Sequence, residues 1–169
     1  MDRGLSLRTA VPADLAGVET LLRRSYPRLL AADYPPSVLV TAVPLIARAK
    51  PELLASGRYY VVEDAGGRII GAGGFSLTGP LPGAAGAAGT AHIRHVATDP
   101  DALRWGVARA ILNRVFRAAE AAGASTYDCL STRTAVPFYA AVGFCELGGV
   151  EITLAAGIVF PAIRMGRAV

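Results

Sequence analysis

The chain has 169 residues, of which 53% are hydrophobic and 18% charged, and its formal net charge is +4 at pH 7. This length suits one hydrophobic core, and we expect residues 1–169 to form a single domain. The composition excludes a disordered chain, and no apolar run reaches the roughly 18 residues of a membrane span.

The termini, charges and cysteines narrow the class of protein further. Residues 1–4 lack the build of a secretory signal, so we expect a cytoplasmic protein that is not bound to a membrane. The arginines are scattered and form no basic tract, which argues against nucleic acid as a partner and favours a compact anionic ligand. Cys129 and Cys145 lack a CxxC pattern and are expected to be reduced, mostly buried thiols. With two histidines and no clustered ligands, we expect no metal.

The N-terminal third predicts one strand followed by helices. Residues 5–8 alternate apolar and polar side chains, which is typical of a short strand. A helix opens at Pro12 and is expected to end near Arg23 and Arg24, whose charges suit a helix C-terminus. Prolines interrupt the helical pattern of residues 25–57, so we expect two or three short helices there.

A β-hairpin and a loop follow. Residues 58–63 and 68–77 are rich in strand-forming side chains and flank a turn at residues 64–67. Residues 79–89 consist almost entirely of Gly, Ala and Pro and predict a loop. This loop lacks the Gly-Lys-Ser/Thr ending of a P-loop.

The C-terminal half alternates strands and helices before a final hairpin. The expected order is strand 91–98, helix 104–122, strand 125–130, helix 134–142, and a hairpin of strands 150–154 and 157–165. Thr134 is expected to cap the second of these helices, and Gly143 to end it. Together with the preceding elements, this order predicts an α/β fold with a mixed sheet.

The start of the longer helix, residues 104–109 (Arg-Trp-Gly-Val-Ala-Arg), predicts an anion site. Gly106 and Ala108 leave the backbone N–H groups of the first turn uncovered, and those donors suit a pyrophosphate. The two arginines can add charge-assisted hydrogen bonds. Close helix packing explains the small residues equally well. A Rossmann motif requires a small residue where Ile111 stands, and the Walker lysine is missing.

A second motif, Ala-x-x-Phe-Tyr-x-x-x-Gly-Phe, occupies residues 135–144. The two motifs, in this order and among alternating strands and helices, resemble the two signatures of the GNAT (GCN5-related) N-acetyltransferases. The resemblance covers about residues 91–144. Three positions depart from the usual pattern: Leu103 replaces Gln or Arg, Ala108 replaces a second glycine, and Thr132 replaces an asparagine.

The resemblance implies an acetyl-CoA-dependent N-acetyltransferase with a mixed, mostly antiparallel central sheet flanked by helices. A backbone N–H of Val96 or Ala97 would face the thioester oxygen, and Tyr139 corresponds to the acid that protonates the CoA thiolate. The residues implied to contact coenzyme A are Val96, Ala97, Thr98, Arg104, Trp105, Gly106, Val107, Ala108, Arg109, Thr132 and Phe138.

Some members of the family carry a glutamate near position 92 that serves as the general base. This chain has His92 at that place and His95 close by, so the resemblance implies one of these histidines as the base and leaves open which. Imidazole can deprotonate an ammonium near neutral pH. Strand alternation places the two histidines on opposite faces of the sheet, so at most one of them would face the substrate. Each could also be a histidine without a catalytic role, either hydrogen-bonded within the protein or exposed to solvent. Arg94 shares the face of His92 and would bind an acidic group on the acceptor or pair with a carboxylate. Asp33 and Tyr34 lie in the segment that shapes the acceptor pocket of the family.

The expected reaction is direct attack on acetyl-CoA by a primary amine of a small molecule or peptide in a ternary complex. The resemblance also implies a possible homodimer, since dimers are common in the family. An acetyl-cysteine route is disfavoured, because neither cysteine sits at a helix start or beside an evident base. Two alternatives stay open. A catalytically silent CoA-binding regulatory module predicts CoA binding without thiol release, and a nucleotide-binding protein or dehydrogenase predicts protection by NAD or ATP.

Overall fold

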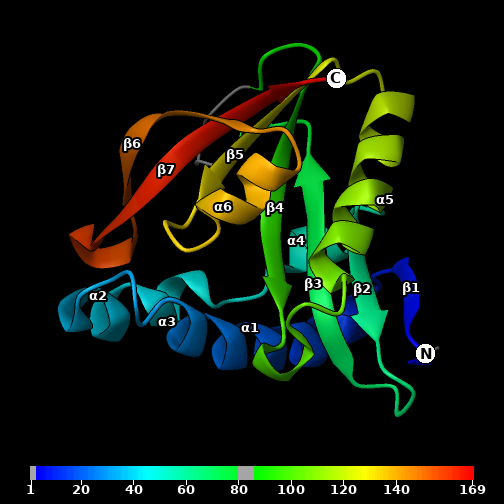
Figure 1. The fold of residues 1–169 in the computed structure, drawn as a ribbon, viewed down its shortest axis with the longest axis horizontal. Helices are drawn as coiled ribbons and strands as arrows, with labels where there is room; N and C mark the ends of the chain where they lie inside the picture. The colour runs from blue at the N-terminus through cyan, green and yellow to red at the C-terminus, as the bar shows by residue number, and fades with distance from the viewer. Residues whose placement is uncertain (1–2, 80–85) are drawn as a thin grey trace.

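The computed structural model describes residues 3–79 and 86–169, in which a seven-stranded sheet separates two groups of helices (Figure 1). The strand order is β1-β2-β3-β4-β5-β7-β6. Neighbouring strands run antiparallel except β4 and β5, which are parallel. The prediction of an α/β fold with a mixed, mostly antiparallel sheet is confirmed.

The elements follow the predicted order. The strands are β1 (Ser6–Thr9), β2 (Tyr59–Glu63), β3 (Ile69–Ser76), β4 (Thr90–Thr98), β5 (Thr126–Ser131), β6 (Cys145–Thr153) and β7 (Val159–Ala168). The helices are α1 (Leu15–Leu29), α2 (Pro36–Thr41), α3 (Val43–Ile46), α4 (Pro51–Leu54), α5 (Val107–Ala121) and α6 (Val136–Ala141). Short 3-10 turns at Pro12–Asp14, Pro100–Ala102 and Ala155–Gly157 precede α1, α5 and β7.

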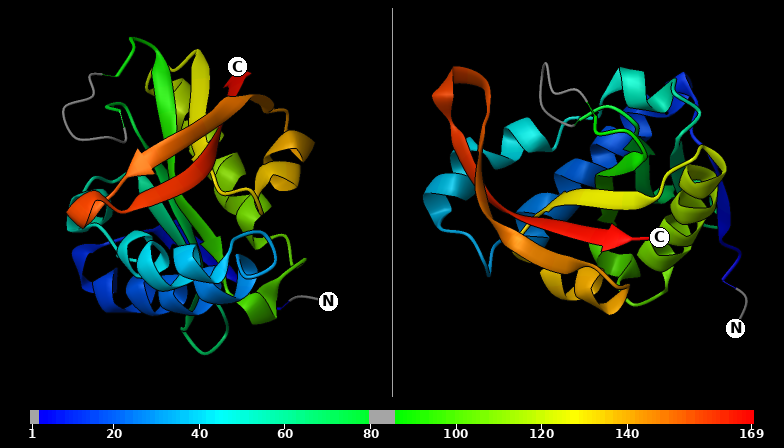
Figure 2. Two further views of the ribbon diagram at one scale, coloured as in Figure 1. Left: turned by 90° about the vertical axis from the view of Figure 1, so that its left-hand side faces the viewer. Right: turned by 90° about the horizontal axis from the view of Figure 1, so that it is seen from above.

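The two groups of helices cover opposite faces of the sheet (Figure 2). On one face, α5 buries the apolar stripe that its sequence predicts, with Val107, Ile111 and Val115 at 3% exposure or less. On the other face, α1 packs Val18 and Leu21 against β2 and β3. Each such fully buried side chain contributes about 1.5–3 kcal/mol of transfer free energy. The sheet is thereby held rigidly between two apolar layers.

Helix α1 is longer than the sequence predicts. It continues past Arg23 and Arg24 to Leu29 and includes Pro27, which removes one backbone donor. Tyr26 and Leu30 pack into the apolar clusters around this turn, and Leu30 is 2% exposed. Tertiary burial therefore offsets the lost hydrogen bond, and the predicted end of the helix is wrong.

Strand β6 begins earlier than expected, at Cys145 in place of Val150. A bulge between Glu146 and Gly148 shifts the register of β6 with β7. The alternation of apolar and polar residues that marks a strand is therefore interrupted in the sequence. Cys145 is exposed at this edge, so the expectation that both thiols are mostly buried holds only for Cys129.

Candidate active site

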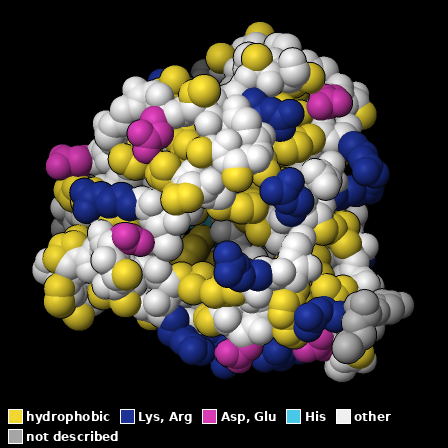
Figure 3. Space-filling view, in the orientation of Figure 1, with side chains coloured by type: hydrophobic (Ala, Val, Ile, Leu, Met, Phe, Trp, Pro, Cys, Tyr) yellow, Lys and Arg dark blue, Asp and Glu magenta, His cyan; other side chains and the backbone are white. Residues whose placement is uncertain are grey.

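A cleft opens where β4 and β5 diverge. The two strands pair in parallel only along residues 90–93 of β4, whereas β4 runs on to Thr98 beside β3 alone. The cleft has a volume of about 760 Å³ and is bounded by α1, the end of β4, the start of α5 and α6. Figure 3 shows the surface hollowed between α1 and α6, with arginine or lysine side chains nearby. The backbone of β4 forms one wall.

A bulge in β4 turns its backbone at this wall. Arg94 faces Gly74 on β3 and Ala97 faces Ala72, so β4 carries one extra residue between the two pairs. His95 within the bulge has a left-handed φ of +47°, and its carbonyl accepts a 2.9 Å hydrogen bond from the buried Tyr59 hydroxyl. Because a trans peptide points its C=O and N–H in opposite directions, the next N–H points away from Tyr59.

The turn before α5 exposes backbone donors. Arg104 and Gly106 both adopt left-handed conformations, with φ of +65° and +81°. A Cβ on Gly106 would meet no atom within 4 Å, so the conformation and not close packing requires glycine there. The first helical bond runs from the Ala110 N–H to the Gly106 carbonyl. In the described chain, the N–H groups of residues 107–109 meet no acceptor and, with the helix dipole, form an anion site.

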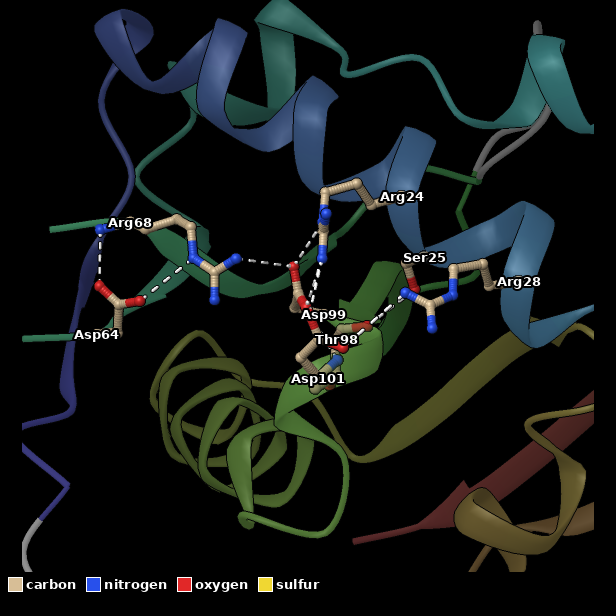
Figure 4. A network of polar contacts seen from close by, with 8 residues as sticks. All are labelled: Arg24, Ser25, Arg28, Asp64, Arg68, Thr98, Asp99 and Asp101. Atoms are coloured by element: carbon tan, nitrogen blue, oxygen red, sulfur yellow. Dashed lines mark hydrogen bonds and ion pairs between the residues drawn. The ribbon is translucent and has the colours of Figure 1, made fainter. Parts of the chain in front are cut away.

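A polar network holds the end of β4 against α1 (Figure 4). Arg24 donates to Asp99 at 3.0 and 3.3 Å and to Asp101 at 3.0 Å, while the Ser25 hydroxyl donates to the Thr98 carbonyl at 2.9 Å. Burial alone would raise the pKa of Asp99, but hydrogen bonds from Arg24 and from the Asp101 N–H lower it below its ordinary value. Asp99 therefore remains ionised, and the network fixes the floor of the cleft.

Tyr139 reaches the cleft from α6 and is 5% exposed. Its ring makes edge contacts with Phe138 and Phe144, both at 5.4 Å between centroids. Gly143 adopts a φ of +96° and the Phe144 N–H bonds back to the Tyr139 carbonyl, so the predicted helix end is confirmed. Burial raises the pKa of Tyr139 well above that of a free phenol, and the adjacent Cys129 acts in the same direction. The phenol is therefore protonated at neutral pH.

The loop between β5 and α6 is tied to the segment after α1. The Thr134 hydroxyl donates to Asp33 at 2.7 Å, the Arg133 N–H donates to the Tyr34 hydroxyl at 2.9 Å, and Tyr34 donates to the Pro161 carbonyl at 2.8 Å. Thr134 therefore does not cap α6 as predicted, because its hydroxyl is engaged elsewhere. Asp33 and Tyr34 shape the surroundings of the cleft through these bonds.

The structure brings together almost every residue predicted to contact coenzyme A. All but Trp105 line the cleft, as does Tyr139: Val96, Ala97, Thr98, Arg104, Gly106, Val107, Ala108, Arg109, Thr132 and Phe138. Trp105 is 38% exposed and lies under the Arg3 guanidinium, 4.4 Å from its ring centroid. Neither His92 nor His95 lines the cleft.

His92 lies on the face of β4 opposite to α5, since its neighbours Ala91 and Ile93 pack in the α5 core. Its Nδ1 lies 3.1 Å from Asp128 on β5. A carboxylate only accepts, so Nδ1 donates to Asp128, and in the neutral form of the ring Nε2 presents its lone pair. In the part of the chain that the structure describes, Nε2 is the one buried side-chain polar atom without a partner.

Comparison with known proteins agrees with this architecture. A family model for the acetyltransferase (GNAT) domain matches residues 42–165. The chain belongs to the GNAT acetyltransferase family. No curated protein matches the sequence. The family model alone therefore assigns the GNAT family.

Solved structures share the GNAT fold at low sequence identity. A GCN5-related N-acetyltransferase from Rhodopseudomonas palustris superposes with a TM-score of 0.77 at 19% identity, over 97% of this chain and 95% of that one. PaiA N-acetyltransferase from Thermoplasma acidophilum, solved with coenzyme A, gives 0.70 at 13% identity over 98% and 99%. The ribosomal-protein-S18-alanine N-acetyltransferase from Escherichia coli gives 0.63 at 17% identity over 97% and 93%.

His95 occupies the bulge of this GNAT domain and is half-buried. Burial lowers its pKa to about 4, and the nearby positive charges of Lys50 and Arg94 act in the same direction. The imidazole is therefore neutral at physiological pH and a weak base there.

Asp128 is a residue of the GNAT domain that no motif in the sequence singles out. It pairs with Arg164, at 3.0 Å, and its other oxygen orients His92. The contact depends on the parallel register of β4 and β5, which no local pattern reveals. Glu63, the carboxylate at the end of β2, pairs with Arg8.

Two further properties of the GNAT domain concern metals and membranes. Over residues 3–79 and 86–169, no three His, Cys, Asp or Glu side chains gather as a set of metal ligands. Over the same residues, the helices are too short or too polar to cross a membrane.

Proposed function

We propose that this GNAT domain transfers the acetyl group of acetyl-CoA to a primary amine of a small molecule or peptide. The observation that carries the proposal is the set of free N–H groups at residues 107–109, placed where the unpaired edge of β4 ends. The pyrophosphate would accept from these groups and from Arg104 and Arg109. The pantetheine arm would then lie along Val96 to Thr98, where β5 has diverged.

The end of β4 and Tyr139 supply the chemistry at the thioester. The amine nitrogen bonds to the acetyl carbon, the C–S bond breaks, and the thiolate takes a proton from the phenol, while the amine loses its own proton to a base. The Val96 N–H, turned away from Tyr59 by the bulge, would stabilise the oxyanion. Burial raises the pKa of Cys129 to about 12, so it stays a thiol, which supports direct attack over an acetyl-cysteine intermediate.

The base in this proposal is His92, positioned by Asp128. Its Nε2 is a buried acceptor without a partner, a state that costs about 1–3 kcal/mol and that a substrate ammonium or a bridging water would relieve. His95 is the weaker candidate, because its pKa is about 4. The amine would thus approach from the face opposite to α5 while coenzyme A enters beside α5 and α6.

A ligand-class experiment tests the proposal. Thermal unfolding is measured with acetyl-CoA, CoA, NAD and ATP, and free thiol is then measured with acetyl-CoA and a panel of amines. We expect the CoA compounds alone to stabilise the protein, by about 2.7 kcal/mol at a concentration of 100 Kd, and at least one amine to release thiol. Stabilisation without thiol release identifies the silent CoA-binding module, and stabilisation by NAD or ATP overturns the assignment.

A further inference from the structure

A second pocket, of about 420 Å³, lies beside the β4 bulge between α4 and the β3–β4 edge. Its polar lining consists mainly of Lys50, Glu52, Ser56, Arg58, Ser76 and Arg94. Three of these six side chains are cationic and one is anionic, so the pocket carries a positive charge.

The cations of this pocket are unpaired. Arg94 is half-buried, and its guanidinium donates to the Ser76 hydroxyl at 3.1 Å. Across the described residues, Lys50, Arg58 and Arg94 form no ion pair, not even with Glu52. Burial lowers the pKa of Arg94, and the negative charge of Glu52 in the same pocket opposes this shift without forming an ion pair. The pocket therefore offers an anion a site that the protein itself leaves open.

Another arginine-lined pocket of the protein contains paired guanidiniums. There, between α1 and the β2–β3 turn, Arg24 and Arg68 line the wall together with carboxylates. Arg24 pairs with Asp99 at 3.0 Å and Arg68 with Asp64 at 3.2 Å. Those guanidiniums are satisfied within the protein, whereas Arg94 forms no ion pair among the described residues.

The position of the pocket relates it to the reaction. Arg94 directly precedes the bulge and stands two residues, about 7 Å of strand, before Val96. Lys50 and Arg94 lie close enough to His95 to lower its pKa. Arg94 also shares the strand face of His92, the face from which the amine would approach. An anionic group held at Arg94 would therefore lie on the side of β4 from which the amine is proposed to approach.

We propose that this pocket binds a carboxylate of the acceptor, so that the acceptor class is an amine that also carries an acid group, such as an amino acid or a short peptide with a free C-terminus. The inference rests on the proposed function. Arg94 provides a fixed pair of donors for the carboxylate, while Lys50 and Arg58 attract it. A polycationic amine is disfavoured by the same charges.

The test compares acids with their amides. Thiol release from acetyl-CoA is measured with L-amino acids, with short peptides, with the C-terminal carboxamides of both, and with polycationic amines. We expect at least one free acid to exceed its carboxamide about 10- to 100-fold in kcat/KM. Arg94→Gln should reduce this ratio to near 1 by raising the KM of the acid, and Arg94→Lys should restore part of it.

A matched control removes the same charge elsewhere. Arg117→Gln on the exposed face of α5 should keep the wild-type preference for acids. Carboxamides or polycations that react as well as acids, or an Arg94→Gln variant that keeps the preference, would overturn the inference while leaving the acetyltransferase proposal intact. Stabilisation by CoA without thiol release from any amine would instead overturn the proposed function, and the inference with it.

Discussion

The Tyr59 hydroxyl donates a 2.9 Å hydrogen bond to the backbone carbonyl of His95, the residue whose φ of +47° marks the bulge in β4. The bond joins the apolar layer beneath α1 to the backbone beside the cleft. Because the peptide between His95 and Val96 is planar, the same bond sets the direction of the Val96 N–H. A buried side chain thus controls the orientation of the proposed oxyanion donor.

Tyr59→Phe should lower kcat about 10-fold with little change in the KM for acetyl-CoA, because the donor is misaligned but the pyrophosphate site is untouched. Steady-state thiol release checks this. Tyr127→Phe is the control, since the hydroxyl of that buried tyrosine lies within donating distance of the Phe116 carbonyl and the Glu120 carboxylate of α5, away from the cleft. Equal losses of kcat in the two variants would contradict a positioning role.

Tyr139→Phe should lower kcat about 100-fold and leave the Kd for CoA within about 2-fold, since the phenol protonates the departing CoA thiolate and the donors proposed to hold the pyrophosphate are unchanged. The ring and its contacts with Phe138 and Phe144 are kept in the variant. Calorimetric titration with CoA and steady-state kinetics measure the two quantities. A parallel loss of affinity and turnover would remove the assigned acid role.

Asp128→Asn should lower kcat/KM for the amine about 10- to 100-fold, because an amide can donate to Nδ1 of His92 and leave the proton on the wrong nitrogen. The pH–rate profile should lose the limb that reports the base. Glu63→Gln provides the comparison, as it removes another strand carboxylate that pairs with an arginine. The same profile in both variants would assign Asp128 a structural role only.

Gly106→Ala should weaken CoA binding about 5- to 10-fold and cost about 1 kcal/mol of stability, because alanine resists the φ of +81°. The added methyl group meets no atom within 4 Å, so a steric clash cannot account for the loss. Gly149→Ala also meets nothing but lacks a positive φ, and serves as the control. CoA affinity and thermal unfolding are measured for both, and unchanged affinity in Gly106→Ala would argue against the anion site.

The half-buried His95, whose pKa is lowered in the folded protein, predicts a pH dependence of stability. An unfolded chain protonates this imidazole below pH 6.5, whereas the folded protein does so only near pH 4. The unfolded state therefore binds more protons in that window, and stability falls on acidification by about 1.4 kcal/mol per pH unit from this residue alone. Above pH 6.5 the residue contributes no slope. His95→Gln should flatten the curve of urea unfolding against pH between 6.5 and 4; an unchanged slope would refute the burial effect.

Local patterns predicted the parts of the molecule that depend on neighbouring residues. The apolar stripe of α5, the glycine that ends α6 and the turn at residues 64–67 all appear where the sequence places them. Periodicity and the conformational freedom of glycine act over a few residues, so they can be recognised without tertiary information. The predicted coenzyme A contacts lie in two short segments, residues 96–109 and 132–138, and all of them except Trp105 line one cleft.

The sequence by itself therefore determined the element order, the family resemblance and the two motifs of the site. Only the tertiary structure decided that Asp128 contacts His92, that Arg94 has no carboxylate partner, and that α1 continues through Pro27. These features depend on strand register and on packing between segments far apart in the chain. Side-chain partners across a sheet are set by the fold as a whole, because a shift of one residue in register would exchange them all.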